Sequence, residues 1–396
     1  MKQHKVLIIG GGASGLAAAI VSARKGNQVT LLERGDRVGK KLLATGNGRC
    51  NLASLGAPCY FGDPDFAGAV LSHMPVQQVL DFFAGIGLPT RPDSAGRVYP
   101  GCNQAAAVLD VLRAQLDALG VRVLTGVEVK ALRPGWQAIT SQGSFAADSV
   151  IVCCGGLAAP KLGAVSAYRL LTDLGCRLIP PAPALAPLET EKAPVKGLSG
   201  LRLPVALTLC GTQPVAAAMG EALFADYGVS GVCAMQLARD AENLLRKGQQ
   251  ATLYMDFSPT LGLTEYRMAR VTPQAPGHNE QQVRQWLHSR ESLPGGDPLL
   301  GALPRLLREK LQKAPARDLS RLLCAYPLRL TGVRGFDQAQ VTQGGIDCRD
   351  FDPATLAHRA LPGLYACGEI LNVDGDCGGY NLQFAFATGM LAGEDA

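Results

Sequence analysis

The clearest hydrophobic pattern in the chain lies in its first residues. Four apolar residues at 6–9 predict a buried strand, and the run of small residues after them predicts a helix to about Lys25. Gly26 and Asn27 end this helix, and residues 28–33 predict the next strand. A strand, a helix and a second strand in this order indicate an α/β domain with a parallel sheet.

Four more stretches continue this pattern. Residues 64–90 predict helical structure with a stop signal at Gly87 and Pro89, and residues 104–120 predict an amphipathic helix with one apolar face. Apolar and polar residues alternate over 121–145, which predicts a small antiparallel meander. Residues 147–156 predict a buried strand that runs into a glycine pair, a second place where backbone can approach a ligand.

The middle of the chain has a different pattern. The segment Pro180-Pro-Ala-Pro marks a boundary. Over 185–257, short strands joined by Gly and Pro turns predict a β-rich inserted domain, in which 203–209 is the clearest strand. Residues 279–290 and 298–313 predict helices.

A final apolar helix is predicted to begin after Gly378-Gly379 and to end near Gly393. Its spacing predicts a stripe that faces the core, formed by Phe384, Ala385, Thr388 and Leu391.

Composition restricts the class of protein. The chain of 396 residues is 47% hydrophobic and 18% charged, which is typical of a globular protein with a large core. Its apolar runs are shorter than a membrane span and its start does not resemble a signal peptide, so we expect a cytoplasmic protein. The formal net charge of +5 is mild and spread out. It permits an anionic substrate or RNA without requiring either, and no RNA-binding motif is visible.

The twelve cysteines do not form a disulfide or metal pattern. They are scattered from Cys50 to Cys377, without a Cys-x-x-Cys pair or a metal-like cluster with histidine. Several lie within apolar strand patterns, where a free cysteine acts as a small hydrophobe. We therefore expect reduced thiols, no metal site, and a Cys50 that is not half of a disulfide.

Three glycines connect the first predicted strand to the first predicted helix. Gly10 permits a tight turn, Gly12 lets backbone N–H groups approach a pyrophosphate, and Gly15 lets the helix pack closely on the strands. The diphosphate would lie at the positive end of the helix dipole, and Glu33 could accept both hydroxyls of an adenosine ribose. This arrangement predicts dinucleotide binding; the alternative is a glycine-rich loop that only packs.

The segment after Glu33 also suggests a site. Residues 34–51 are glycine-rich and basic, with almost no periodicity, and such a loop within a compact domain is unusual without a function. Arg49, Cys50 and Asn51 follow directly on a Gly-x-Gly, which favours a binding site over a surface excursion.

The other end of the chain supplies a second half of the site. A predicted strand at 363–367 leads into Gly368 and Glu369, where the acid could accept a ribityl hydroxyl and the glycine could bring backbone to a pyrophosphate. The positive end of the last helix, at Gly378-Gly379, would favour a reduced flavin. Each segment alone is also typical of ordinary packing. Together with the N-terminal glycines they favour FAD over NAD.

These residues carry a resemblance to a known family. The matching segments are GGGASG at 10–15, KKLLATGNGRCN at 40–51, CCGGLAAP at 153–160, VTQGGID at 341–347 and GLYACGEILNVDGDCGGYNLQFA at 363–385. Across its whole length the chain resembles a bacterial family of FAD-dependent oxidoreductases. That family includes a bile-acid 4,6-reductase, a ribosomal-RNA dihydrouridine synthase and an aminoacetone oxidase.

The resemblance implies an α/β fold in three parts. These are a two-part Rossmann-like FAD-binding domain, an inserted β-barrel-like domain and a small helical subdomain. The expected boundaries are 1–184 and 334–396 for the FAD-binding domain, 185–257 and 316–333 for the inserted domain, and 258–315 for the helical subdomain.

The resemblance also implies non-covalent FAD. The N-terminal glycines and Glu33 would hold the ADP half, and segments 49–51 and 368–381 would lie along the flavin half. The expected cofactor-binding residues are Gly10, Gly12, Ala13, Ser14, Gly15, Glu33, Arg34, Lys41, Thr45, Gly46, Gly48, Arg49, Cys50, Asn51, Val129, Cys154, Gly155, Gly156, Gly368, Glu369, Gly378, Gly379, Tyr380 and Asn381.

One position departs from the family pattern. Many members have Phe-Thr-His-x-Gly-x-Ser-Gly in the inserted domain, where this chain has Phe224-Ala-Asp-Tyr227-Gly-Val-Ser-Gly231. Because Tyr227 replaces the histidine, no substrate is transferred from the relatives. A tyrosine over the open face of the flavin could donate a proton; the alternative is that it only packs. Cys50, as a weak donor, and Asn51 complete the expected catalytic set.

The leading function is therefore an FAD-dependent oxidoreductase that reduces an activated C=C in a small-molecule substrate. A single dinucleotide fingerprint implies that NAD(P)H, the expected electron donor, binds transiently. Three alternatives stay open: a flavin oxidase of a small amine or ketone that uses oxygen, an RNA-modifying enzyme of the dihydrouridine-synthase kind, and an FAD-binding protein without turnover. No DNA or membrane partner is expected, and the sequence leaves the oligomeric state open.

Overall fold

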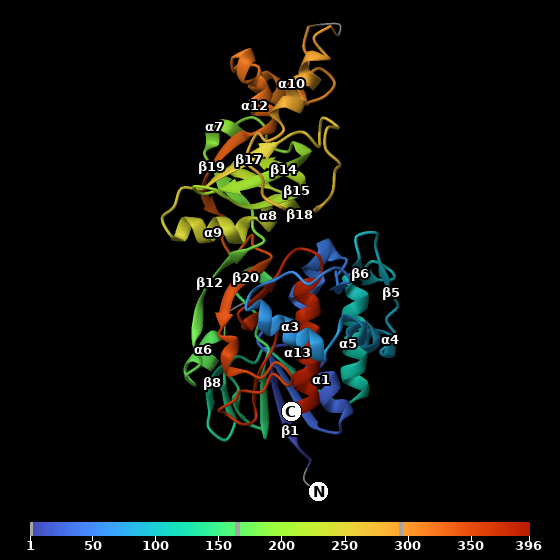
Figure 1. The fold of residues 1–396 in the computed structure, drawn as a ribbon. Helices are drawn as coiled ribbons and strands as arrows, with labels where there is room; N and C mark the ends of the chain where they lie inside the picture. The colour runs from blue at the N-terminus through green and yellow to red at the C-terminus, as the bar shows by residue number, and fades with distance from the viewer. Residues whose placement is uncertain (1–2, 163–166, 293–295) are drawn as a thin grey trace. The chain divides into compact units, whose positions relative to one another are not determined.

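The chain forms two compact units in a computed structural model. The second unit, Pro183–Gln340, is inserted into the first, which comprises Met1–Ala182 and Val341–Ala396 (Figure 1). The residues that the structure describes are 3–162, 167–292 and 296–396.

A five-stranded parallel sheet forms the centre of the first unit. Its order is β21 (Leu364–Ala366), β11 (Ser149–Val152), β1 (Lys5–Ile9), β2 (Gln28–Glu33) and β7 (Arg122–Thr125). The apolar residues of β1 and β11 are buried, as expected for the central strands of such a sheet. The predicted Rossmann-like fold is confirmed, and strands from both ends of the chain contribute to it.

The predicted meander over 121–145 is wrong in its first strand. β7 joins the parallel sheet, whereas β8 (Val129–Arg133), β9 (Gln137–Thr140) and β10 (Gly143–Ala146) form the antiparallel sheet. Alternation of apolar and polar residues indicates a strand with one buried face. It does not indicate whether the neighbouring strand runs parallel or antiparallel to it. An edge strand of a parallel sheet therefore gives the same pattern as a hairpin strand.

The first and last long helices of the unit pack closely together. They are α1 (Ala13–Arg24) and α13 (Tyr380–Asp395). A Cβ at Gly389 of α13 would lie 2.2 Å from the backbone oxygen of Ser14 in α1. Only glycine permits this approach, which holds the C-terminal helix against the N-terminal one.

The predicted apolar stripe of α13 is too narrow. Ala385 is only half-buried, whereas Phe386, Ala387 and Met390, which lie outside the predicted stripe, are buried. The reason is that α13 is covered on several sides, since it contacts α3 (Pro64–His73) as well as α1 (Figure 1). A helix that packs on more than one side buries more than a single stripe of side chains.

The predicted helical stretch 64–90 contains two helices. α3 ends before Met74, and α4 (Val76–Gly85) begins after Pro75, whose extended backbone interrupts the helical path. The other elements of the first unit are α2 (Lys40–Ala44), α5 (Ala105–Ala118), α6 (Tyr168–Thr172), β3 (Ala53–Ser54), β4 (Tyr60–Gly62), β5 (Thr90–Pro92), β6 (Arg97–Pro100), β12 (Leu178–Ala184), β20 (Val341–Ile346) and β22 (Val373–Gly375).

The second unit contains a closed six-stranded barrel, which confirms the predicted β-barrel-like insertion. The strands in order around it are β14 (Arg202–Cys210), β17 (Thr252–Asp256), β19 (Tyr326–Val333), β13 (Leu188–Thr190), β16 (Gly228–Ser230) and β15 (Pro214–Ala225). Pairing of β15 with β14 closes the barrel, and β18 (Ala269–Val271) pairs with residues 217–219 of β15 on the edge opposite β14.

Helices accompany the barrel in the second unit. The predicted helix 279–290 is α10 (Glu280–His288), but the one predicted over 298–313 begins only at Arg305, because the extended backbone of Pro304 precedes it. The helices not yet given are α7 (Lys192–Val195), α8 (Val232–Gln236), α9 (Ala238–Arg246), α11 (Arg305–Leu311) and α12 (Leu319–Cys324). Among the described residues, every helix falls short of the length and apolar character that a bilayer span requires.

Candidate functional site

The turn between β1 and α1 has the geometry that its glycines predict. Gly10 has a φ of +107°, and a Cβ there would lie 2.4 Å from the backbone oxygen of Cys153. A Cβ at Gly15 would lie 1.9 Å from the backbone oxygen of Gly10. These two glycines are needed by the protein's own packing.

Gly12 differs from both, because its surroundings are open. No described atom lies within 4 Å of the position that its Cβ would take. Gly12 is also the N-cap of α1, and no described side chain caps that helix. The start of this twelve-residue helix is therefore uncapped and has room beside its N-cap residue, as an anion-binding helix end requires.

Glu33 is held in place by backbone donors. Its Oε2 accepts from Gly11 N at 2.8 Å and its Oε1 from Gly35 N at 2.6 Å. Each carboxylate oxygen has a second lone pair, so both can still accept from a ligand hydroxyl. Of the neighbouring candidates, Arg34 is exposed and Val129 begins β8.

The loop after α2 has an unusual backbone. Gly46, Asn47 and Gly48 have φ values of 57°, 55° and 80°, and Cys50 has a φ of 59°. Thr45 closes this loop, since its backbone oxygen accepts from Cys50 N at 3.0 Å. Left-handed backbone at non-glycine residues is costly and concentrates at functional sites.

Cys50 is a buried thiol within this loop. Its side chain is 0% exposed, and burial raises its pKa to about 12, so it stays protonated at neutral pH. A protonated thiol is a weak S–H donor and not a thiolate nucleophile. Arg49 lies with its guanidinium 4.9 Å from the ring centre of Tyr99.

Asn51 offers an unused acceptor. Its Oδ1 is buried and has no hydrogen-bond partner among the described residues. A Cβ at Gly379 would lie 2.7 Å from this oxygen, which places it beside the start of α13. A buried amide oxygen without a donor is costly, so a ligand N–H or O–H would relieve it.

Glu369 connects three segments of the first unit. Its Oε1 accepts from Thr342 N at 2.8 Å, and its Oε2 accepts from Gly156 N at 3.2 Å and from Lys41 Nζ at 2.9 Å. The hydroxyl oxygen of Thr342 accepts from the backbone N of Leu157 at 2.8 Å. These bonds fix the glycine pair at the end of β11 beside β20.

The sequence reasoning missed Thr342 as a site residue. It lies in VTQGGID, the motif at 341–347, and it is fully buried in a strand whose other residues are buried as well. The hydroxyl group of a threonine in a fully buried strand needs a hydrogen-bond partner. A threonine in such a strand is therefore the sequence signal for this residue.

The turn that bears Glu369 also contacts both long helices. Gly368 has a φ of +74°, and its N–H donates to Thr388 Oγ1 in α13 at 3.0 Å. A Cβ at Gly368 would lie 2.8 Å from Ser14 Oγ in α1. The strand end, α1 and α13 therefore meet at this glycine.

Tyr380 and Asn381 hold the loop before α13. The amide of Asn381 accepts from Gly375 N at 2.8 Å and donates to Gly375 O at 2.7 Å. The Tyr380 hydroxyl donates to Ala57 O at 3.0 Å. Gly379, with a φ of 104°, is the N-cap of α13, and no described side chain caps this helix. A second uncapped helix start is thus fixed in the same unit.

Cys154 and Tyr227, two further residues expected in the site, make contacts within their own units. Cys154 lies at the end of β11, its thiol donates to Ile9 O at 3.4 Å, and burial raises its pKa. Tyr227 lies in the second unit, in the turn between β15 and β16. Arg334 places its guanidinium 4.9 Å from the Tyr227 ring centre and pairs with Glu189 at 2.8 Å.

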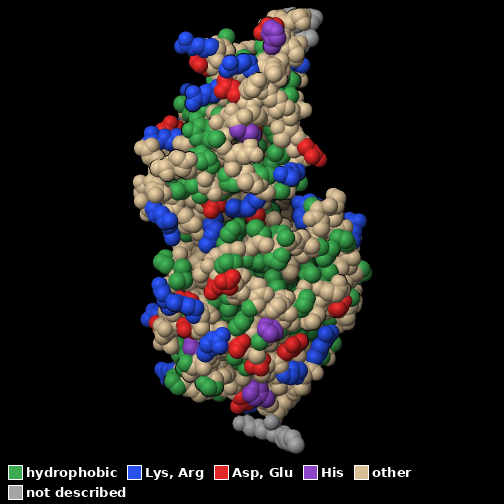
Figure 2. Space-filling view, viewed as in Figure 1, with side chains coloured by type: hydrophobic (Ala, Val, Ile, Leu, Met, Phe, Trp, Pro, Cys, Tyr) green, Lys and Arg blue, Asp and Glu red, His purple; other side chains and the backbone are tan. Residues whose placement is uncertain are grey.

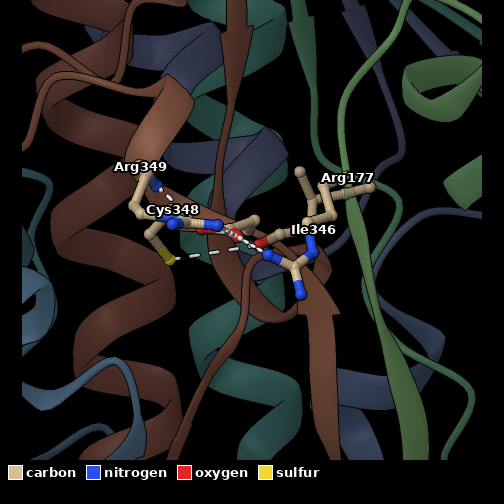
Figure 3. A network of polar contacts seen from close by, with 5 residues as sticks. Arg177, Ile346, Cys348 and Arg349 are labelled. Carbon is tan, nitrogen blue, oxygen red and sulfur yellow. Dashed lines mark hydrogen bonds and ion pairs between the residues drawn. The ribbon is translucent and has the colours of Figure 1, made fainter.

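The last residue of the VTQGGID motif has a structural role. Asp347 is paired with Arg349, whose Nη2 lies 2.7 Å from Asp347 Oδ2, and Arg177 lies 3.9 Å from the same oxygen (Figure 3). The hydrogen bond from Arg349 holds the pKa of Asp347 below its usual range. These contacts secure the end of β20, the strand that presents Thr342 to Glu369.

A cysteine, an aspartate and a histidine also meet in the first unit, which the sequence did not indicate. Ligand atoms of Cys176, Asp350 and His358 lie within 4.8 Å of one another. However, Nδ1 of His358 accepts from the backbone N–H groups of Ala360 and Leu361, both at 3.1 Å. The ring proton is therefore on Nε2, where a metal would have to bind. We assign His358 a capping role.

Taken together, the fold and these contacts define a class of protein. A glycine turn at a parallel sheet, two uncapped helix starts and two positioned carboxylates are features of Rossmann-like dinucleotide-binding proteins. The chain matches the family model of the HI0933-like protein Rossmann domain over residues 4–395, and it belongs to this family. Members of the family are FAD-dependent oxidoreductases.

Individual relatives agree with this membership. The chain is 38% identical to a 3-dehydro-bile acid delta(4,6)-reductase from Clostridium scindens, with 100% of this chain and 99% of the relative covered. It is 27% identical to a ribosomal RNA dihydrouridine synthase from Haemophilus influenzae, with 96% of each chain covered. A 3-ketosteroid delta1-dehydrogenase structure from Sterolibacterium denitrificans has the same fold, with a TM-score of 0.51 at 14% identity, over 100% of this chain and 99% of that one.

The residues present fit FAD as the group that this site would hold. The free space at Gly12 and the uncapped start of α1 suit a diphosphate. The spare lone pairs of Glu33 and Glu369 suit ribose and ribityl hydroxyls, and the partnerless Asn51 Oδ1 suits a donor on the cofactor or its substrate.

Proposed function

We propose that this chain binds FAD without a covalent bond in its first unit and reduces an activated C=C, with NAD(P)H as the electron donor. The observation that carries the proposal is the 38% identity to a 3-dehydro-bile acid delta(4,6)-reductase over the whole chain. The name of that relative describes a ketone conjugated with two double bonds. We therefore propose a conjugated ketone as the substrate class here.

The cofactor assignment follows from the contacts of the first unit. Gly10, Gly12 and Gly15 would bring the start of α1 to the diphosphate, and Glu33 would accept from the adenosine ribose. Glu369 would accept from the ribityl chain through its remaining lone pair. FAD held there would, once reduced by NAD(P)H, supply the hydride that the reduction of the C=C needs.

Reduction of a conjugated ketone requires a hydride at one carbon and a proton at its neighbour. We propose Tyr227 as the proton donor, because a phenol can transfer a proton and this residue replaces a family histidine. Arg334 stacks on its ring and is itself anchored by Glu189, so the tyrosine side chain has a defined position within the second unit.

A second candidate substrate is a uridine in RNA. It is favoured by the 27% identity to a ribosomal RNA dihydrouridine synthase, and the C=C of uridine is also conjugated with a carbonyl. The charge of the chain supports it weakly. On the face drawn in Figure 2, basic and acidic side chains are interspersed over the first unit rather than gathered in one basic patch.

Anaerobic half-reactions test the proposal. The yellow protein is mixed with NADPH or NADH without oxygen, and bleaching is followed at the flavin absorbance. The reduced protein is then mixed in parallel with a steroid 4,6-dien-3-one, a uridine-containing RNA fragment, or oxygen. Fast reoxidation by the dienone supports the proposal, and fast reoxidation by RNA supports the second candidate. Reoxidation by oxygen alone would indicate an oxidase, and a protein that cannot be reconstituted with FAD would contradict the assignment of the cofactor.

A further inference from the structure

Lys41 and Glu369 form an ion pair in the candidate cofactor site. Lys41 Nζ lies 2.9 Å from Glu369 Oε2, although 328 residues separate the two in sequence. Their side chains are 31% and 20% exposed, so the pair is partly withdrawn from water. Such a pair keeps more of its Coulomb attraction than one on the open surface.

The pair lies at the edge of the sheet where the dinucleotide turn is located. A Cβ at Gly155 would be 3.7 Å from Glu369 Oε2 and 4.0 Å from Lys41 Nζ. Gly155 lies three residues beyond the end of β11, and Cys153, the first residue after that strand, lies against Gly10 of the dinucleotide turn. Both charges are therefore on the side of the unit to which we assign the cofactor.

A carboxylate at this position creates an electrostatic problem. FAD brings a negatively charged diphosphate, and the flavin gains negative charge when it is reduced, so Glu369 alone would repel both. The backbone N–H groups of Gly156 and Thr342 orient the carboxylate without bringing a formal charge. Lys41 brings the opposite charge directly to the carboxylate.

We propose that Lys41 is a positioning residue that neutralises Glu369, so that a carboxylate needed for ribityl binding can lie beside an anionic cofactor. The proposal rests on the FAD binding proposed above. It has a distinctive consequence, which is that Lys41 matters only while Glu369 is charged. Loss of Lys41 should therefore cost far less affinity when Glu369 has already been neutralised than it costs in the wild-type chain.

A double-mutant cycle on the full-length protein tests this. The variants are Lys41→Met, Glu369→Gln and the double variant, and the two readouts are the FAD dissociation constant after reconstitution and the flavin midpoint potential. Lys41→Met should weaken FAD binding by about tenfold and lower the potential, because the reduced flavin then faces an unbalanced carboxylate. In the Glu369→Gln background the same change should weaken binding by less than about threefold.

Two control variants test whether the positive charge at position 41 is responsible for the effect. Lys40→Met removes the same charge from the adjacent position, where the lysine pairs with Asp36 instead, and it should leave both readouts near wild type. Lys41→Arg keeps a cation and should restore most of the affinity. The melting temperature of each apo variant shows that loss of FAD does not reflect unfolding.

Three outcomes would overturn the proposal. Equal losses from Lys41→Met in both backgrounds would mean that Lys41 acts on the cofactor without Glu369, while FAD binding itself would stand. Equal losses from Lys40→Met and Lys41→Met would mean that only net charge matters. A wild-type protein that takes up no FAD would contradict the proposed function itself and, with it, this role of Lys41.

Discussion

Backbone geometry at a few residues decides what the candidate site can hold. Gly10 and Gly15 are required by contacts inside the protein, whereas the space beside Gly12 is left open. Asn51 keeps a buried oxygen without a partner among the described residues. Substitutions at Gly10 or Gly15 should therefore lower the stability of the protein. Substitutions at Gly12 or Asn51 should change ligand binding alone.

Gly12→Val separates these two effects. The backbone of Gly12 is extended, with a φ of −85°, so valine can adopt it, and no described atom obstructs the new side chain. We expect a folded protein with a nearly unchanged melting temperature that purifies without FAD, because the methyl groups occupy the place of the diphosphate. Absorbance at the flavin band and thermal unfolding measure the two properties.

The matched control for that variant is Gly68→Val. Gly68 also has open surroundings, but it lies in α3, away from the dinucleotide turn. The Gly68→Val variant should therefore retain FAD. Full FAD occupancy in Gly12→Val would show that the diphosphate is not bound there.

The high pKa of Cys50 predicts a chemically inert thiol. Burial raises that pKa to about 12, so at pH 8 the thiolate fraction is roughly one in ten thousand. Cys102, by contrast, is exposed. With iodoacetamide at pH 8, mass spectrometry should find Cys102 labelled and Cys50 unlabelled until the protein unfolds. Equally fast labelling of both would contradict the burial of Cys50.

Tyr227→Phe tests the proposed proton donor. The substitution removes only the hydroxyl, so the ring that stacks on Arg334 is kept. Flavin reduction by NAD(P)H should stay near normal, while reoxidation by the unsaturated substrate should slow about 100-fold or more. Stopped-flow absorbance measures both half-reactions. An unchanged second half-reaction would leave Tyr227 with a packing role only.

At the scale of elements, the candidate site is built from segments at the two ends of the chain that pack together. α1 and α13 approach so closely that Gly389 has no room for a side chain against Ser14. Gly368 lies at the same junction and bonds to Thr388 of α13. The position of the start of α13 therefore depends on packing that lies between about two and three turns further along the helix.

Gly389→Ala should consequently destabilise the first unit. The new methyl group would lie 2.2 Å from Ser14 O, so the helices must separate, at a cost of about 2 kcal/mol or more. The measurement is chemical unfolding together with FAD affinity, and both should fall. Gly85→Ala in α4 is the control, because nothing lies within 4 Å of that position and its stability should not decrease. If Gly389→Ala is as stable as that control, α1 and α13 have room for a methyl group at this contact.

The hydrophobic periodicity of the sequence predicts most of these helices and strands. It does not predict which of them contact one another. The first strand, α5 and α13 follow from periodicity and end signals, as expected for long elements with a strong pattern. β7 was assigned to the wrong sheet, because alternation does not specify a neighbour. The contacts of Glu369 with Lys41 and Thr342 join distant segments and depend on the tertiary fold, so spacing in the sequence could not reveal them.

At the scale of the whole molecule, the proposed FAD-binding residues and the proposed proton donor belong to different units. All the residues assigned to FAD lie in the first unit, whereas Tyr227 and the barrel lie in the second. The insertion leaves and re-enters the first unit at neighbouring points, since Gln340 N donates to Leu185 O at 3.1 Å. Such an insertion can be removed without a long gap in the remaining chain.

Excision of the second unit tests this division of tasks. A chain of residues 1–184 joined to 341–396 by a short Gly-Ser linker should keep the parallel sheet and both helix starts. We expect it to bind FAD within about tenfold of the full-length affinity, because the assigned contacts all remain. It should fail to pass electrons to the unsaturated substrate, because the proposed proton donor is gone. The same chain with Gly12→Val should be colourless, which identifies the yellow species as specifically bound FAD. An excised chain that is folded by circular dichroism but takes up no FAD would show that the second unit contributes to the cofactor site.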